Sequence, residues 1–259
     1  MIIEVRDDGR VERREFLLVS HRGGKGFGPE NTLEALEAAL ISGVEMLETD
    51  VRMSGDGIPF IHHGPFLGLS LLAHMSMREI KERAPHVPTL REYLEVAGGR
   101  CPLNLEIKRC DPDVLARALE EAPTFSYLLV SSFDADFLRS FGRTGAGAEL
   151  GLLSQFEIAH ERMLRDANDC GASVILPSRL MVSDGLVKAA HAAGLRMIPW
   201  TVNGLESLEE MVLAGSDGVI TDCYATFHDR LIAGPISRDG GGDTQSAPVP
   251  HRRERGRAT

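Results

Sequence analysis

The sequence predicts a single α/β domain built as a (β/α)8 TIM-type barrel. Apolar strand-like runs alternate with helical patterns in one pass from Phe16 to Ile232, which implies parallel strands joined by crossover helices. About eight such units in about 220 residues match a closed barrel better than an open doubly wound sheet. No linker interrupts the alternation, so two stacked smaller domains are the weaker interpretation.

The barrel strands are predicted at short apolar runs that are bounded by turn residues. In chain order they are Phe16–Ser20, Val44–Met53, Leu103–Ile107, Tyr127–Val130, Glu149–Leu152, Ser173–Leu176, Arg196–Trp200 and Gly218–Ile220. A further short strand, Ile58–His62, follows the turn at Gly55-Asp56-Gly57.

The helices are predicted from apolar positions that recur every three or four residues. The predicted apolar face of the first helix consists of Leu33, Leu36, Leu40 and Ile41, and Gly43 ends this helix. Later, Asp111 and Pro112 suit the cap and first turn of a helix. The predicted helices are Thr32–Ser42, Met77–Ala84, Leu90–Ala97, Asp113–Ala122, Ala135–Phe141, Ile158–Asp169, Ser183–Ala193, Ser207–Ala214 and Ala225–Ile232.

The two ends of the chain are predicted to lie outside the barrel. Residues 1–15 are dense in charge and fit an exposed leader or a short β-hairpin that turns at Asp8-Gly9. Residues 16–234 form the barrel domain. Residues 235–259 are rich in Gly, Pro, Ser, Arg and Asp without periodic apolar positions, which predicts a disordered tail.

The composition indicates an ordinary globular protein, with 43% hydrophobic and 25% charged residues among 259. A formal net charge of −10 argues against general affinity for nucleic acid or anionic membrane surfaces. No stretch approaches the roughly 18 apolar residues of a membrane span. The four cysteines show neither a CxxC pair nor zinc-like spacing, and no secretory signature is visible. We therefore expect a soluble cytoplasmic protein; the oligomeric state stays open.

Three carboxylates are expected to converge at the C-terminal ends of the strands, where (β/α)8 enzymes build their sites. Glu48 and Asp50 stand two apart in the second strand and so share one face. Glu106 and Lys108 do the same in the third strand. Three buried carboxylates repel one another, and a divalent cation, Mg²⁺ or Ca²⁺, would relieve that repulsion through oxygen ligands.

Two histidines and two cations complete the candidate site. His21 follows the first strand and His63 follows the short apolar run Ile58–His62, and together they suggest an acid–base pair, although His21 alone could be a core histidine. Arg22 and Lys108 could pair with the carboxylates or hold a phosphate. Two histidines beside a cation are what the hydrolysis of a small-molecule phosphodiester needs.

Two further residues are expected at the edge of this site. Glu30 lies in a Pro-led turn before the first helix, where Thr32 can cap the helix while Glu30 or Asn31 faces the site. Trp200, the single tryptophan, either packs in the barrel or forms a wall for an apolar or polyol group.

These residues resemble the glycerophosphodiester phosphodiesterase family from His21 to about Thr226. The motifs that carry the resemblance are His21-Arg22-Gly23, Pro29-Glu30-Asn31-Thr32, Glu48-Thr49-Asp50-Val51, Asp56-Gly57 leading to His63, Val87-Pro88-Thr89-Leu90, Leu103 to Lys108, Trp200 to Asn203, and Asp217 to Asp222. The resemblance implies a (β/α)8 barrel, a divalent cation, and hydrolysis of glycerophosphodiesters to sn-glycerol 3-phosphate and an alcohol.

The resemblance also implies a role for each candidate residue. His21 and His63 would form the acid–base pair, and three carboxylates would bind the metal: Glu48, Asp50 and Glu106. Arg22 and Lys108 would contact phosphate, and Glu30 would be a further site residue.

The chain departs from the family pattern after His63. Gly64 stands where the family usually has Asp, and Pro65–Met75 is apolar and lacks the usual Thr-rich loop. A smaller departure is Cys223-Tyr224, where the family often has proline. Two alternatives therefore stay open, namely a phospholipase D-like enzyme acting on lysophospholipids and a binding or regulatory homologue with little turnover.

Overall fold

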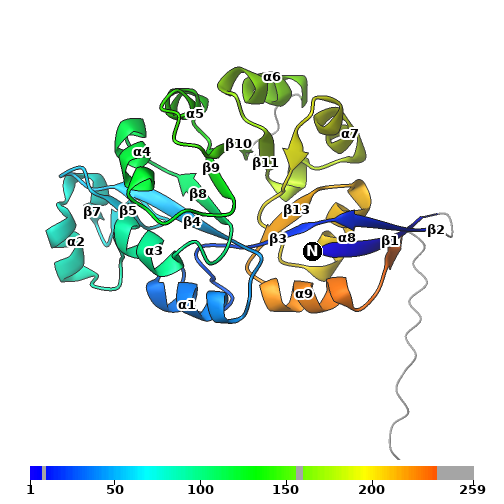
Figure 1. Ribbon diagram of the computed structural model, residues 1–259, viewed down its shortest axis with the longest axis horizontal. Helices are drawn as coiled ribbons and strands as arrows, with labels where there is room; N and C mark the ends of the chain where they lie inside the picture. The colour runs from blue at the N-terminus through cyan, green and yellow to red at the C-terminus, as the bar shows by residue number, and fades with distance from the viewer. Residues whose placement is uncertain (8–9, 156–159, 238–259) are drawn as a thin grey trace, which may run out of the picture.

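Eight parallel strands form a nearly closed barrel in the computed structural model, which describes residues 1–7, 10–155 and 160–237 (Figure 1). Their order around the barrel is β12-β11-β10-β9-β8-β4-β3-β13. The strands are β3 (Leu17–Ser20), β4 (Met46–Met53), β8 (Leu103–Ile107), β9 (Leu128–Ser132), β10 (Glu149–Ser154), β11 (Val174–Pro177), β12 (Arg196–Met197) and β13 (Gly218–Thr221). The predicted fold class is confirmed.

Backbone hydrogen bonds between the last two strand segments close the barrel. The amide of Asp217 donates to the carbonyl of Met197 over 2.8 Å, and the amide of Val202 donates to the carbonyl of Ile220 over 3.0 Å. The predicted strand Arg196–Trp200 is thus regular only in its first two residues, although its later residues still take part in closure.

Helices surround the barrel and bury its outer face (Figure 1). They are α1 (Leu33–Ile41), α3 (Leu90–Ala97), α4 (Pro112–Glu120), α5 (Ala135–Gly142), α6 (His160–Cys170), α7 (Asp184–Ala192), α8 (Leu205–Ala214) and α9 (Tyr224–Ile232). Among the described residues, no helix has the length and apolar character that crossing a membrane requires.

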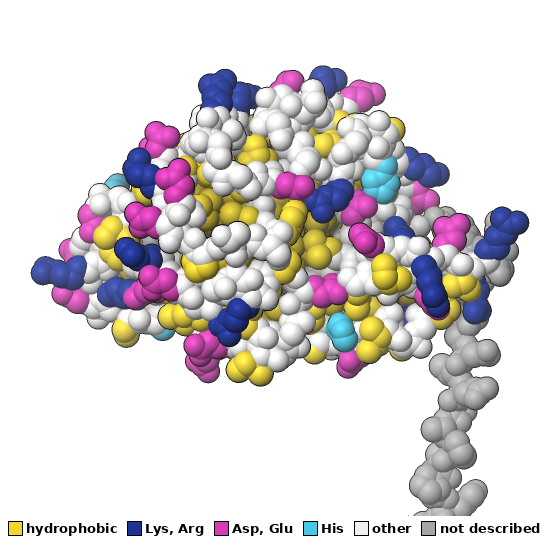
Figure 2. Space-filling model, in the orientation of Figure 1, with side chains coloured by type: hydrophobic (Ala, Val, Ile, Leu, Met, Phe, Trp, Pro, Cys, Tyr) yellow, Lys and Arg dark blue, Asp and Glu magenta, His cyan; other side chains and the backbone are white. Residues whose placement is uncertain are grey.

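Alternation along each strand sends every second side chain into the barrel. The inner apolar cluster consists of Val19, Met46, Leu129, Leu153, Val174, Leu176, Ile198 and Ile220. On the face seen in Figure 2, hydrophobic side chains gather toward the centre and most charged ones lie around them. Since Met46 points into the barrel, Glu48 and Asp50 follow it on the same face of β4.

A small insertion with its own apolar core lies between β4 and α3. It contains β5 (Pro59–Ile61), the hairpin of β6 (Phe66–Leu67) and β7 (Ser70–Leu71), a 3-10 turn (Leu72–His74) and α2 (Met77–Arg83). Its core is formed by Phe60, Leu72, Met75, Met77, Ile80, Ala84 and Val87. The hairpin was not predicted, because the run Pro65–Met75 has neither a clear strand nor a clear helix period.

The N-terminal segment pairs with the last described residues. Strands β1 (Ile2–Asp7) and β2 (Arg10–Glu15) form an antiparallel hairpin, and β14 (Ile236–Ser237) joins β1 in parallel. This pairing extends past residue 234, where we predicted the barrel domain to end. The predicted turn at Asp8-Gly9, the start of the predicted helix Ile158–Asp169 and the tail from residue 238 lie outside the described residues.

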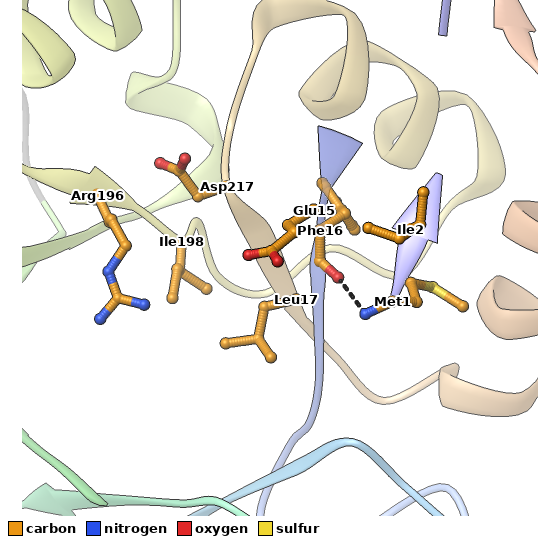
Figure 3. A pocket seen from close by; sticks show the side chains of 8 residues that line it. All are labelled: Met1, Ile2, Glu15, Phe16, Leu17, Arg196, Ile198 and Asp217. Carbon is orange, nitrogen blue, oxygen red and sulfur yellow. Dashed lines mark hydrogen bonds between the residues drawn. The ribbon is translucent and has the colours of Figure 1, made fainter. Parts of the chain in front are cut away.

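A cavity of about 430 Å³ lies at the N-terminal end of the barrel. Figure 3 shows Leu17, Arg196 and Asp217 around it, and these residues start or immediately precede β3, β12 and β13. The Met1 amino group donates to the Phe16 carbonyl over 3.0 Å (Figure 3). Since (β/α)8 enzymes build their sites at the C-terminal ends of the strands, this cavity lies at the opposite end from the candidate site.

The close approach of β13 to β3 gives the first prediction. A Cβ atom at Gly218 would overlap the Leu17 carbonyl oxygen and lie 2.9 Å from the Leu17 Cβ. We expect Gly218→Ala to lower the free energy of unfolding by about 1–3 kcal/mol, measured by urea denaturation. Gly185→Ala in α7 is the control, because the added Cβ would meet only Ser183 Oγ at 3.8 Å and should be neutral or stabilising. Equal effects of both substitutions would contradict the prediction.

Candidate active site

Three buried carboxylates meet inside the C-terminal end of the barrel. The exposed fractions of Glu48, Asp50 and Glu106 are 1%, 1% and 7%. Asp50 and Glu106 are paired residues of the adjacent strands β4 and β8. One oxygen from each of the three carboxylates lies within 4.8 Å of the others. The parallel register of two strands is therefore enough to assemble the cluster.

Burial, mutual repulsion and the neighbouring cations give the three carboxylates different pKa values. Burial, helped by the charges of Asp50 and Glu106, raises the pKa of Glu48 well above its ordinary value. Burial also raises the pKa of Glu106, with Lys108 opposing and Asp50 adding to the shift. Burial alone would raise the pKa of Asp50, but the hydrogen bond with His63 and the charge of Lys108 outweigh it and hold that pKa low. The neighbouring cations thus compensate the negative charge of the cluster only in part.

The donor set fits a divalent cation. All three side chains offer carboxylate oxygens, which Mg²⁺ and Ca²⁺ prefer as ligands. Within the described part of the chain, Glu48 Oε1 is buried without a hydrogen-bond partner, which is costly unless another group binds it. The triad could therefore hold a metal ion.

His21 is held by a carboxylate from the last strand of the barrel. Its Nδ1 donates to Asp222 Oδ1 over 2.7 Å, and Asn203 Nδ2 donates to Asp222 Oδ2 over 2.9 Å. The contact follows from closure, because β13 pairs with β3 through Thr221 and Ser20, one residue before Asp222 and His21. His21 Nε2 then lies 3.9 Å from Glu48 Oε2, which leaves that nitrogen available toward the cluster.

His63 is held between Asp50 and Arg22. His63 Nε2 lies 2.9 Å from an Arg22 guanidinium nitrogen, and a guanidinium can only donate. The imidazole therefore accepts at Nε2 and donates from Nδ1 to Asp50 Oδ1 over 3.1 Å. Arg52 fixes the His63 backbone, since two of its nitrogens donate to the His63 carbonyl over 2.8 and 3.0 Å.

Two cationic side chains border the cluster. Lys108 Nζ lies 3.2 Å from Asp50 Oδ1 and also bonds Glu106. The Arg22 backbone amide donates to Glu48 Oε2 over 2.8 Å, and its guanidinium donates to Glu30 over 2.9 Å. Among the described residues, Arg22 Nε is buried without an acceptor. This donor could serve an anion that enters the site.

Glu30 and Trp200 lie farther from the carboxylates. Glu30 is exposed and reaches the cluster through Arg22. Trp200 donates from Nε1 to the Leu176 carbonyl over 2.8 Å, and its ring meets Phe133 edge to face at 5.6 Å between centroids. Lys108 Nζ lies 5.8 Å from the Phe133 ring centroid, so Trp200 connects to the cluster through two side chains.

Two partners of the site residues, Asp222 and Arg52, were absent from the set that we predicted, and Asn31 was expected only as the alternative to Glu30. Asn31 donates to Asp50 Oδ2 over 2.8 Å and accepts from Thr49 over 2.8 Å. Asp222 and Arg52 support the two histidines. Asp222 could have been predicted from its position after the eighth strand, because barrel closure brings that strand beside the first. Arg52 could have been predicted from its spacing of two residues from Asp50.

The pairing of Asp222 with His21 predicts a pH-dependent stability. Burial would raise the pKa of Asp222, but the hydrogen bond and charge of His21 outweigh it and lower that pKa. A carboxylate with a depressed pKa stabilises the fold above its unfolded value of about 3.9, and this stabilisation is lost as the pH falls. We expect Asp222→Asn to lower the free energy of unfolding by about 1 kcal/mol at pH 7, measured by urea denaturation.

The difference in the free energy of unfolding between Asp222→Asn and the wild type should shrink as the pH is lowered from about 5 toward 3. Asp229→Asn is the matched control, because the Asp229 side chain is 84% exposed and should show little difference at any pH. A gap that stays constant between pH 7 and pH 3 would argue against the ion pair.

Comparison with known proteins identifies the family. Residues 21–226 match the model of the glycerophosphoryl diester phosphodiesterase family. A glycerophosphodiester phosphodiesterase of Caldanaerobacter subterraneus is 28% identical over 80% of this chain and 93% of its own length. A second, from Bacillus altitudinis, is 29% identical over 83% and 96%.

Solved structures agree with that match. An Oleispira antarctica phosphodiesterase, in complex with the product sn-glycerol-3-phosphate, is 26% identical, with a TM-score of 0.75 over 84% of this chain and 97% of its own. A glycerophosphodiester phosphodiesterase of Thermotoga maritima is 25% identical, with a TM-score of 0.71 over 85% and 100%. The chain therefore belongs to the glycerophosphoryl diester phosphodiesterase family, a family of phosphoric diester hydrolases.

Proposed function

We propose that the protein hydrolyses glycerophosphodiesters to sn-glycerol 3-phosphate and an alcohol, with a divalent cation and two histidines. One observation carries the proposal: each imidazole lies against a different carboxylate of the same face of β4, His21 near Glu48 and His63 on Asp50. The product named for the Oleispira antarctica relative supports the substrate class.

Glu48, Asp50 and Glu106 would hold the cation, either Mg²⁺ or Ca²⁺. Support comes from their shared burial, the short separations of their oxygens and the unpartnered Glu48 Oε1. A bound divalent cation would stabilise negative charge on the phosphoryl oxygens. Asn31 would orient Asp50, because it already donates to that carboxylate.

Arg22 and Lys108 would bind the phosphate. Arg22 offers the buried Nε donor, and Glu30 holds its guanidinium in place through the 2.9 Å hydrogen bond. Lys108 contributes a compact charge next to two carboxylates. When a phosphate draws the Arg22 guanidinium away from His63, the Nε2 lone pair of that histidine becomes free to accept a proton.

The two histidines would share the proton transfers. His63 Nε2 accepts a hydrogen bond from Arg22 in the observed arrangement, so this nitrogen can act as a base. His21 presents its Nε2 to the cluster while Asp222 accepts from its Nδ1 and would stabilise its imidazolium form; in that form Nε2 carries the proton that His21 gives to the leaving alkoxide. Trp200 and Phe133 would form the wall against which the remaining part of the substrate lies.

A phospholipase D-like activity on lysophospholipids is the second candidate. It is favoured by the large apolar side chains exposed on the strand-to-helix loops, among them Phe66 at 55% and Leu69 at 102%. The ratio of kcat/KM for lysophosphatidylcholine and glycerophosphocholine separates the two candidates. We also propose the cytoplasm as the compartment, supported by four free cysteines.

Removal of either histidine should abolish catalysis. We expect His21→Ala and His63→Ala to lower kcat/KM for glycerophosphocholine by about 10²-fold or more, since each would remove one proton-transfer group. His191→Ala is the control, because that histidine pairs with Asp217 away from the cluster and should retain activity. Thermal unfolding checks that the variants fold. Full activity of either site variant would refute the assignment.

Chelation should remove activity, and Mg²⁺ or Ca²⁺ should restore it. In Glu48→Gln the cation should restore little, because the variant lacks one negative ligand. Glu149→Gln is the matched control, since Glu149 pairs with Arg196 at the start of β10 and should leave the recovery intact. Activity that survives exhaustive chelation would contradict cation dependence.

A further inference from the structure

The tip of the β6–β7 hairpin exposes two large apolar side chains. Phe66 is 55% exposed and Leu69 is 102% exposed, so Leu69 contributes no packing to the fold. The run from Pro65 to His74 contains no Asp, Glu, Lys or Arg. Exposed apolar groups that cluster on a short segment indicate a contact surface rather than a structural need.

The base of the hairpin is firmly held. Leu67 packs on the insertion core, and the Leu72 amide donates to the Pro65 carbonyl over 2.9 Å. Arg83 of α2 donates to Ser70 Oγ over 2.9 Å. In Figure 1 β7 lies beside α2 at one end of the molecule. Because the base of the hairpin is fixed, the hairpin can bind a surface through its apolar side chains without losing backbone conformational entropy.

Two further exposed leucines lie on the other side of the barrel mouth. Leu180 follows β11 and is 78% exposed, and Leu205 follows β12 and is 44% exposed. We call Phe66, Leu69, Leu180 and Leu205 the apolar rim. In the strand order, β11 is four strands from β4, which places the two parts of the apolar rim on opposite sides of the mouth. A single small ligand touches one side, whereas an extended surface can touch both.

Cationic side chains accompany the apolar rim. Arg83 contacts the hairpin, Arg179 precedes Leu180, and Arg109 follows β8; all three are exposed. Guanidinium groups beside apolar side chains complement a surface that has phosphate groups above hydrocarbon. The net charge of −10 disfavours a strongly anionic surface, so a zwitterionic one fits best.

We propose that the apolar rim docks the protein on a zwitterionic phospholipid surface, so that the site draws its phosphodiester from lipid–water interfaces. The inference rests on the proposed function, since docking serves hydrolysis of a phosphodiester. His63 is only three residues before Phe66, so the mouth of the docked barrel would face the lipid headgroups. A protein partner fits less well, since one that covered both sides of the mouth would close the site to substrate.

Vesicle binding tests the proposal. The wild-type protein should sediment with sucrose-loaded phosphatidylcholine vesicles, and Phe66→Ser/Leu69→Ser should bind at least about tenfold more weakly, since two apolar side chains no longer enter the lipid. Ile41→Ser/Ile232→Ser is the matched control: those residues are 84% and 62% exposed but end α1 and α9, at the other end of the barrel. This control should bind like the wild type.

Hydrolysis of glycerophosphocholine, which forms no surface, separates this inference from the proposed function. Phe66→Ser/Leu69→Ser should retain wild-type kcat/KM on that substrate. Absence of wild-type binding, or equal binding by all three proteins, would overturn the docking proposal while leaving the hydrolysis intact. Concentration-dependent association without lipid that the rim variant loses would assign the surface to a second protein chain and also overturn it. Vesicle binding without hydrolysis would instead refute only the proposed function.

Discussion

The burial of three carboxylates at one end of a parallel barrel is the constraint on which the site depends. Glu48, Asp50 and Glu106 are nearly inaccessible to water, and their mutual repulsion must be offset. Lys108, His63 and the Arg22 backbone amide offset part of it through direct contacts with the cluster, and the low pKa of Asp50 follows from His63 and Lys108. The raised pKa of Glu48 shows what these partners leave uncompensated. A cation bound among the three would supply the missing charge.

The barrel determines which groups can reach that cluster. Parallel register places Asp50 opposite Glu106, and closure places Asp222 beside His21. The loop before α1 folds over β4, where Asn31 meets Asp50. The catalytic proposal thus depends on strand order more than on any single loop. The insertion differs: it carries its own core, positions His63 between its strands β5 and β6, and exposes Phe66 and Leu69 away from that core.

Local patterns predicted the strands, the helices and the shared faces of β4 and β8, because alternation alone puts Glu48 with Asp50 and Glu106 with Lys108. Contacts between distant segments were harder to predict. The pairing of Asp222 with His21 depends on closure of the barrel. The hydrogen bonds from Arg52 to the His63 carbonyl depend on the path that the insertion takes. The β6–β7 hairpin and β14 escaped prediction because two-residue strands carry almost no periodic signal.

Calorimetric titration of the chelator-treated protein with Mg²⁺ and with Ca²⁺ tests the central claim most directly. The account predicts one bound cation per chain, with proton release because a cation would lower the pKa values of Glu48 and Glu106, which burial raises in the free protein. Glu106→Gln should weaken this binding strongly. Wild-type protein that binds neither cation, or Glu106→Gln protein that binds as tightly as the wild type, would contradict the carboxylate cluster as the cation site.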